Sequence, residues 1–348
     1  MRLGLSLGYW SAGNDVTNLE LAKEADQLGF SVAWVAEAYG SDAPTVLAWL
    51  AAQTSSIDLG SAVLQIPART PAMTAMTAAT LDVLSGGRFR LGLGVSGPQV
   101  SEGWHGVPFA SPLGRTREYV EIVRAALRRE RLSYDGQHYR LPLPDGLGKA
   151  LHLTIHPVRE HIPLYLAAIG PRNLRLTGEI ADGWLPVFFA PEHAGHQLEH
   201  LERGAADAGK TVADIDIAPS VPLVIGPDWR ACADAVRGYA ALYLGGMGSK
   251  KQNFYNQLAC RMGYERDALR VQEHYLDKDY TGAMEAVPAE FIDATSLLGP
   301  IERVAERMGR YAETGVGTLT VSPLSTGDTS AVATLRAAAE AFDKAGVA

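Results

Sequence analysis

The fold is decided by residues 57–106, which read IDLGSAVLQIPARTPAMTAMTAATLDVLSGGRFRLGLGVSGPQVSEGWHG. An apolar run from Leu59 to Ile66 predicts a buried strand, and Pro71 opens a helix that extends to Leu84. A second apolar strand, 88–95, then leads into a glycine-rich loop. Strand, helix and strand at this spacing predict one βαβ unit of a parallel sheet.

The same alternation continues along the whole chain of 348 residues. A Rossmann fold would place a G-x-G-x-x-G loop after the first strand, and Gly8-Tyr9-Trp10 does not fit that pattern. We therefore predict an α/β fold, a (β/α)8 TIM barrel in one domain over 1–348, with a helical insertion at 245–288 before the last βα unit. The eight predicted strands start near Leu3, Ser31, Leu59, Arg88, Pro163, Asp182, Ile215 and Gly317.

Net charge and cysteine content limit the binding partners and the cellular compartment that we expect. The net charge of −8 argues against a nucleic-acid binder and against a membrane-surface protein. The two cysteines, Cys232 and Cys260, predict a reducing compartment without a disulfide framework. Neither a signal peptide nor a bilayer-spanning apolar run is recognisable, so we expect a cytoplasmic protein.

Several motifs in this order carry a resemblance to a known family. They are LGLSLGYW, WVAEAYGSDA, the stretch quoted above from Ile66 onward, LYLAAIGPRNLRLTGEIADGWLP and LYLGGMGSKKQNFYNQLA. The chain resembles the bacterial luciferase-like superfamily of flavin-dependent barrels and, within it, the branch that uses the deazaflavin coenzyme F420.

The resemblance implies where the cofactor lies. Its deazaflavin ring would rest against a β-bulge with a non-proline cis peptide at Ala62-Val63, with Val63-Leu64 as the alternative, and Gln65 would lie beside it. Its phosphate would lie at the loop Ala168-Ile169-Gly170-Pro171-Arg172. Free N–H groups at a helix start favour an anion, which supports this placement independently. The second polar edge of the site would be formed by Gly94, Ser96 and Gly97.

The resemblance also places an acidic residue, Glu37, near the polar edge of the ring. Relatives that oxidise a sugar phosphate carry a catalytic histidine at the next position, where this chain has Ala38. Their acidic residue after the fourth strand has no clear equivalent either, because Gly97-Pro98 stands there. The sequence therefore argues against sugar-phosphate dehydrogenation.

Two residues are candidates for proton transfer. His105 lies between Trp104 and Gly106, and histidine is the side chain most often used for proton transfer; the alternative is a structural histidine bonded to a loop carbonyl. For Glu37 the alternative is a helix-capping or ion-paired carboxylate. Five aromatic residues near strand ends are candidates for the walls of a substrate pocket, with ordinary packing as the alternative: Tyr9, Trp10, Tyr39, Trp104 and Trp184.

Other charged patterns have simpler explanations. The arginines of residues 115–129 alternate with glutamates at helical spacing, which predicts a solvated, salt-bridged face. His196 and His200 lie one helical turn apart but outside an H-E-x-x-H pattern, so no metal site is predicted.

We therefore expect a coenzyme F420-dependent oxidoreductase that moves a hydride between the deazaflavin C5 and a small organic substrate. The first alternative is an FMN-dependent monooxygenase of the same superfamily, supplied with reduced flavin by a reductase partner. The second is a non-catalytic barrel that binds a flavin-like ligand. We also expect a homodimer or a larger homo-oligomer.

Overall fold

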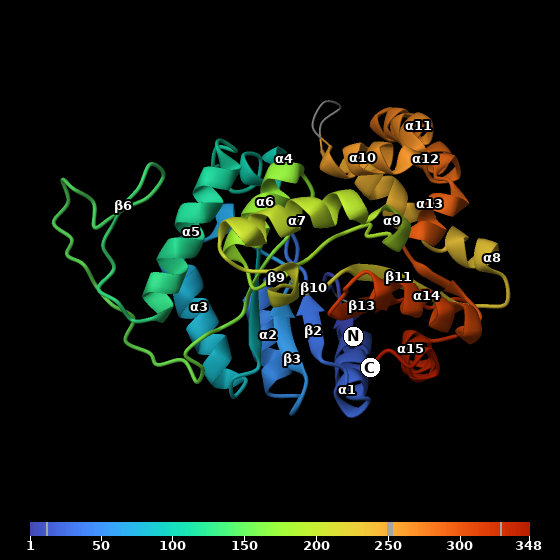
Figure 1. Ribbon diagram of the computed structural model, residues 1–348, viewed down its shortest axis with the longest axis horizontal. Helices are drawn as coiled ribbons and strands as arrows, with labels where there is room; N and C mark the ends of the chain where they lie inside the picture. The colour runs from blue at the N-terminus through green and yellow to red at the C-terminus, as the bar shows by residue number, and fades with distance from the viewer. Residues whose placement is uncertain (12, 249–252, 328) are drawn as a thin grey trace.

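Strands and helices alternate in the computed structural model, which describes residues 1–11, 13–248, 253–327 and 329–348 (Figure 1). The strands are apolar runs buried on both faces, as in Val32–Val35, which is characteristic of a parallel sheet covered by helices. The barrel strands start at or within two residues of the eight predicted positions: β1 (Arg2–Ser6), β2 (Val32–Val35), β3 (Asp58–Ser61) continued by β4 (Leu64–Gln65), β5 (Phe89–Gly94), β8 (Leu164–Leu166), β9 (Gly183–Trp184), β10 (Asp216–Ile217) continued by β11 (Ser220–Ile225), and β13 (Thr318–Pro323).

Parallel pairing closes these strands into a ring. β1 pairs with β2 on one side and with β13 on the other, and pairing runs on through β3, β5, β8 and β9. The gap between β9 and β13 is closed by one strand in two parts, β10 and β11. β10 pairs with β9, and β11 pairs with β13. The predicted strand from Ile215 to Ile225 is thus broken at Ala218-Pro219, since a proline has no N–H to give to a ladder. The predicted (β/α)8 barrel is confirmed.

The helices that follow the strands cover the outside of the ring. Several of these helices begin with a proline, and several are capped by the side chain of the preceding residue. In α3, for example, the N-cap Thr70 accepts a hydrogen bond from the Met73 amide at 3.2 Å. No helix among the described residues has the length and apolar character needed to cross a bilayer. The outer helices are α1 (Asp15–Gln27), α2 (Ala43–Ala51), α3 (Pro71–Leu84), α5 (Pro112–Leu127), α6 (Pro171–Ile180), α7 (Gly195–Asp207), α8 (Trp229–Asp234), α14 (Ile301–Glu313) and α15 (Ala331–Ala345).

Between α8 and α14 the chain adds a group of short helices at the upper right of Figure 1. They pack around a second apolar core that includes Phe188, Val271 and Phe291. Residues 249–252 of the predicted insertion lie outside the described residues. The elements are α9 (Arg237–Ala241), the π-helical turn η4 (Leu242–Gly246), α10 (Phe254–Ala259), the π-helical turn η5 (Cys260–Tyr264), α11 (Glu265–Leu276), α12 (Tyr280–Ala286), α13 (Ala289–Ala294) and β12 (Leu297–Gly299).

The sequence did not predict β12, which pairs with the end of β11 outside the ring. On the other side of the barrel, a small antiparallel hairpin extends from the molecule (Figure 1). The remaining elements are this hairpin, β6 (Tyr134–Asp135) and β7 (Arg140–Leu141), and four short helices, η1 (Ile66–Ala68), α4 (Pro98–Ser101), η2 (Pro191–His193) and η3 (Val212–Asp214).

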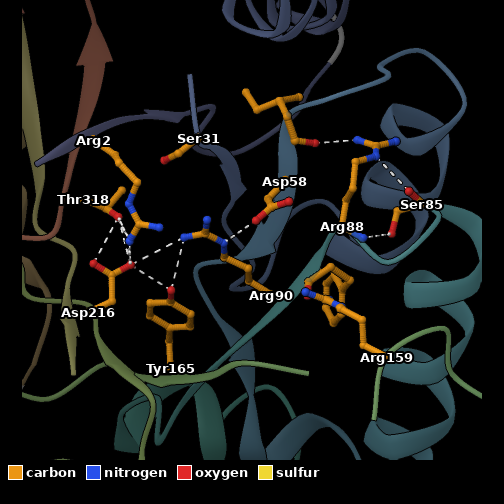
Figure 2. Close-up of polar contacts among 12 residues, drawn as sticks. Arg2, Ser31, Asp58, Ser85, Arg88, Arg90, Arg159, Tyr165, Asp216 and Thr318 are labelled. Carbon is orange, nitrogen blue, oxygen red and sulfur yellow. Dashed lines mark hydrogen bonds and ion pairs between the residues drawn. The ribbon is translucent and has the colours of Figure 1, made fainter. Parts of the chain in front are cut away.

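An ion-paired network fills the amino end of the barrel (Figure 2). Asp216 accepts hydrogen bonds from Arg2 at 3.0 Å, Tyr165 at 2.9 Å and Thr318 at 2.9 Å. Arg90 lies 3.5 Å from the same carboxylate and donates to Asp58 at 2.8 Å. These residues occupy the first or second positions of their strands, so this end of the barrel is closed by side chains.

We predict that Asp216→Asn lowers the free energy of unfolding by about 3 kcal/mol, because it leaves the buried Arg90 without one of its two counter-charges. The measurement is the midpoint of urea unfolding at neutral pH. Asp207→Asn is the matched control, since it breaks an exposed ion pair with Arg175 and is expected to leave the midpoint unchanged. Equal shifts for both variants would contradict a special role for the buried network.

Candidate active site

A group of apolar residues lies where the third barrel strand is interrupted. Leu59 pairs with Phe89 and Leu64 with Leu93, so five steps on β3–β4 match four steps on β5. One extra residue in a strand is a β-bulge, as the family resemblance implied. The peptide bond between Ala62 and Val63, inside this bulge, is cis.

Three small side chains form a surface at this point, which we call the platform: Ala62, Val63 and Ala167. Each is partly exposed, whereas the flanking strand residues Ser61 and Leu64 are fully buried. On the inner side the platform packs against a cluster inside the barrel, made of Val32, Trp34, Tyr165, Leu185 and Ala218. The platform therefore presents an open apolar face at the carboxyl end of the strands.

The glycines of β5 allow the bulge to approach closely. A Cβ on Gly94 would lie 2.5 Å from the Val63 Cγ2 atom, and one on Gly92 would lie 1.8 Å from the carbonyl oxygen of Ser61. Such contacts exclude any side chain at these positions. Gly94, predicted as a cofactor-binding residue, thus acts by letting the platform form next to it.

A polar edge lies beside the platform. The buried Gln65 donates to the carbonyl oxygen of Ala38 at 2.6 Å and accepts from the Ser96 hydroxyl at 2.9 Å. These bonds join the ends of β2, β4 and β5. Gly97 follows directly and is the N-cap of α4. The structure therefore brings Gln65, Ser96 and Gly97 together at the same end of the barrel as the platform.

The start of α6 is open to an anion. Gly170 is its N-cap and Pro171 its first residue, so no side chain of the cap satisfies the first-turn N–H groups. By contrast, Asp42, Thr70 and Ser330 cap their own helices with side-chain oxygens. A Cβ built on Gly170 would meet no atom within 4 Å. Unpaired N–H groups at a helix start attract negative charge.

The loop before α6 is anchored to the core of the barrel. Ala168 is buried, and its carbonyl oxygen accepts a hydrogen bond from the indole nitrogen of Trp184 at 2.9 Å. Ile169 packs against the second apolar core, and Arg172 is exposed on the first turn of the helix. The predicted phosphate loop is thus a fixed, open segment one residue from the platform.

The contacts of Glu37 favour the structural alternative over proton transfer. Its carboxylate forms a two-point ion pair with Arg69 and accepts from the Ala43 amide at 3.1 Å. Burial alone would lower the pKa of Arg69, but the pairing with Glu37 holds that pKa above its ordinary value. Glu37 therefore fixes Arg69 and the start of α2, which is the alternative that the sequence left open.

Two of the five predicted wall aromatics are core residues, which corrects that prediction. Trp10 is 9% exposed and packs edge-on against Trp49 at 5.6 Å, and Trp184 is fully buried against Phe189. Both side chains are therefore buried rather than exposed at a pocket wall. The other three are exposed and stay available as walls: Tyr9, Tyr39 and Trp104.

His105 lies in the loop that follows α4. Its amide donates to the Val100 carbonyl oxygen at 3.0 Å, so the main chain of the loop is ordered. The Nε2 atom of its ring is buried and has no hydrogen-bond partner among the described residues. If His105 served only to bond a loop carbonyl through Nε2, that atom would have a hydrogen-bond partner.

Sequence reasoning missed one residue of the platform, Ala167. Ala167 directly precedes the predicted Ala168, and strand alternation turns the two side chains to opposite faces. That signal is present in the sequence, but it is not specific to a binding site.

Comparison with known proteins places this geometry in a family. The model of the luciferase-like monooxygenase family matches residues 13–318. A Mycobacterium tuberculosis protein whose name assigns it to the coenzyme F420-dependent oxidoreductases is 44% identical over 329 residues, 92% of this chain and 95% of that protein. The 5,10-methylenetetrahydromethanopterin reductase of Archaeoglobus fulgidus is 29% identical over 300 residues, 84% of this chain and 85% of the relative.

A solved structure shares the whole fold. The coenzyme F420-dependent tetrahydromethanopterin reductase of Methanopyrus kandleri superposes with a TM-score of 0.82 at 26% identity, covering 97% of each chain. The family match spans most of this chain and includes β2 to β11, the strands that carry the platform and the α6 loop. This protein belongs to the luciferase-like monooxygenase family.

Proposed function

We propose that this protein is an oxidoreductase that uses coenzyme F420 and moves a hydride between the deazaflavin C5 and a small organic substrate. The observation that carries the proposal is the pairing of an open apolar platform with an uncapped helix start one loop away. The names of its relatives, several of which include coenzyme F420, support the same choice of cofactor.

The residues fit such a cofactor. Ala62, Val63 and Ala167 offer a flat apolar support for one face of a planar ring, and Gln65 and Ser96 provide polar groups at its edge. The N–H groups of the first turn of α6 would hold the phosphate. When bound, the deazaflavin supplies the hydride chemistry, and the chain supplies orientation and proton handling.

His105 is the residue that we assign to proton transfer. Its Nε2 atom is buried without a hydrogen-bond partner among the described residues, and a buried polar atom without a partner is a mark of a functional rather than a structural role. Glu37 stays in the proposal as a positioning residue, because its carboxylate is fully engaged by Arg69 and the Ala43 amide.

The first prediction of this proposal concerns cofactor choice. Titration with oxidised coenzyme F420 should change the intrinsic tryptophan fluorescence in a saturable way, while FMN should produce a much weaker response. Tight FMN binding without a response to coenzyme F420 would contradict the proposal and favour the flavin-dependent monooxygenases of the family.

A second prediction tests the phosphate site. Gly170→Asp should raise the dissociation constant of coenzyme F420 about tenfold or more, because the new carboxylate occupies the first-turn N–H groups and repels the phosphate. The same change should leave the free energy of unfolding unchanged or raise it by roughly a few tenths of a kcal/mol, since aspartate is a good N-cap. Isothermal calorimetry and urea unfolding would measure the two effects.

Gly170→Ala is the control for Gly170→Asp. It adds a methyl group into open space without a charge, so cofactor binding should stay close to that of the parent protein, while the free energy of unfolding should fall by about 0.5 kcal/mol because alanine is a poorer N-cap than glycine. If Gly170→Asp binds the cofactor normally, the phosphate is held elsewhere and this part of the proposal fails.

A third prediction concerns His105. His105→Ala should reduce substrate-dependent oxidation of the reduced cofactor about a hundredfold or more, the usual contribution of a positioned general acid or base. Cofactor affinity should remain, and the melting temperature should change little, because no Nε2 hydrogen bond is lost. A large drop in melting temperature with unchanged turnover would instead identify a structural histidine.

A further inference from the structure

A cavity of about 270 Å³ lies beside the polar edge, outside the site proposed for the cofactor. Its walls are η1 and the start of α3, the end of β5, α4 with the loop that leads to α5, and the residue before β7. It shares no lining residue with the platform, with the polar edge or with the loop before α6. The two spaces are nevertheless close, because Ile66 and Val95 line the cavity and adjoin Gln65 and Ser96 in the chain.

Most of the cavity wall is apolar. Its lining includes the side chains of Ile66, Val95, Val107, Phe109 and Tyr139. Apolar side chains around a concave space favour an apolar ligand. A space of this size holds roughly nine water-sized groups, which corresponds to an apolar body of about six or seven carbon atoms with one small polar group.

The loop that forms one wall is fixed by hydrogen bonds of its own. The Ser101 hydroxyl donates to the Val107 carbonyl oxygen at 2.7 Å, and the Val107 amide donates to the Ser101 carbonyl oxygen at 2.8 Å. The Glu102 carboxylate accepts a hydrogen bond from the Phe109 amide at 2.9 Å. A ligand therefore does not have to order this wall when it binds.

Two arginines line the cavity, and their charges are compensated differently. Arg69 pairs with both Glu37 and Asp42. Arg115 donates through Nε to the Ala110 carbonyl oxygen at 3.1 Å and forms no ion pair with any described residue. Arg115 is therefore the charged group that is available to a ligand in the cavity.

The acidic side chains on the elements around Arg115 are committed to other partners. Glu118, one helical turn away on α5, accepts hydrogen bonds from three successive amides of the β6–β7 hairpin at 2.8 to 3.0 Å. Glu102 holds the loop, as described above. The gaps in the described ranges fall outside the segments that line the cavity: 12, 249–252 and 328. A carboxylate from a ligand would supply the missing counter-charge.

We infer that this cavity is a second ligand site, which binds a small molecule with an apolar body and one carboxylate paired with Arg115. A guanidinium binds a carboxylate through two parallel hydrogen bonds and balances one negative charge. A phosphate monoester carries a charge of about −1.5 to −2 at neutral pH, which one guanidinium does not balance. The inference goes beyond the proposed function and does not depend on it, because no residue of the cofactor site lines the cavity.

The test is isothermal calorimetry on the full-length protein at neutral pH. Two pairs of compounds with equal apolar bodies are the probes: hexanoate with hexanamide, and benzoate with benzamide. We expect at least one of the two acids to bind with one molecule per chain and at least tenfold more tightly than its amide, because hydrogen bonds to an ionised group are the stronger ones. Saturation of the protein with coenzyme F420 should change that dissociation constant less than threefold.

Arg115→Gln removes the charge and keeps a long polar side chain. It should weaken binding of the acid at least tenfold and leave the amide unaffected. Arg128→Gln is the matched control, because Arg128 ends the same helix and forms an exposed ion pair with Glu130 away from the cavity. Ala68→Phe is a second variant that keeps every charge and fills the cavity from the opposite wall, so it should abolish binding of the acid. The melting temperature of each variant reports whether it is folded.

Four results would overturn the inference. They are no binding of either acid, equal affinities for an acid and its amide, equal effects of Arg115→Gln and Arg128→Gln, and displacement of the acid by coenzyme F420. The last result would place the acid in the cofactor site. The titrations without coenzyme F420 stand even if the proposed function fails, so the two failures are distinguishable.

Discussion

The ion-paired network around Asp216 and Arg90 is the constraint on which the arrangement of this protein depends. Closing eight parallel strands into a ring leaves two ends, and at the amino end the first residues of β1, β3, β10 and β13 fill the opening with paired charges. Because that end is occupied by paired side chains, the ligand site is expected at the carboxyl end. The platform, the polar edge and the open helix start all lie there, on loops that the ring itself positions.

Charge is distributed unevenly between the two ends. Near the barrel mouth, Glu37 and Asp42 both pair with Arg69, so one of the two carboxylate charges is balanced. The same end carries the apolar platform, the polar edge at Gln65 and Ser96, and the exposed residues Tyr9 and Tyr39. This distribution suits a ligand that is flat and largely uncharged, apart from one anionic group at the start of α6.

The barrel could be read from the sequence because its signals are local. The apolar runs, the prolines that open helices and the glycines that end strands all act within a few residues, and the eight predicted strands correspond to those in the structure. The bulge at Ala62 and the open loop at Gly170 were placed by resemblance to a family, which carries information that periodicity lacks. β12 was missed because its three residues are too short to form a pattern.

Side-chain partners could not be read in the same way. Arg69 meets Glu37 across 32 residues of sequence, and Arg2 meets Asp216 across 214, so neither contact follows from spacing. Trp10 and Trp184 follow or end strands as predicted, but a strand end says nothing about whether its ring points into the core or toward the mouth. The burial of both rings decided that question.

The hydrogen bond from the Trp184 indole to the Ala168 carbonyl has a consequence for the energetics of recognition. Because the core already immobilises the main chain before Gly170, the entropic cost of ordering that loop is met during folding. An arriving anion then loses only its own freedom of movement. Selectivity at this position would follow from preorganisation, through the fixed spacing of the amides, rather than from a loop that adapts to whatever it meets.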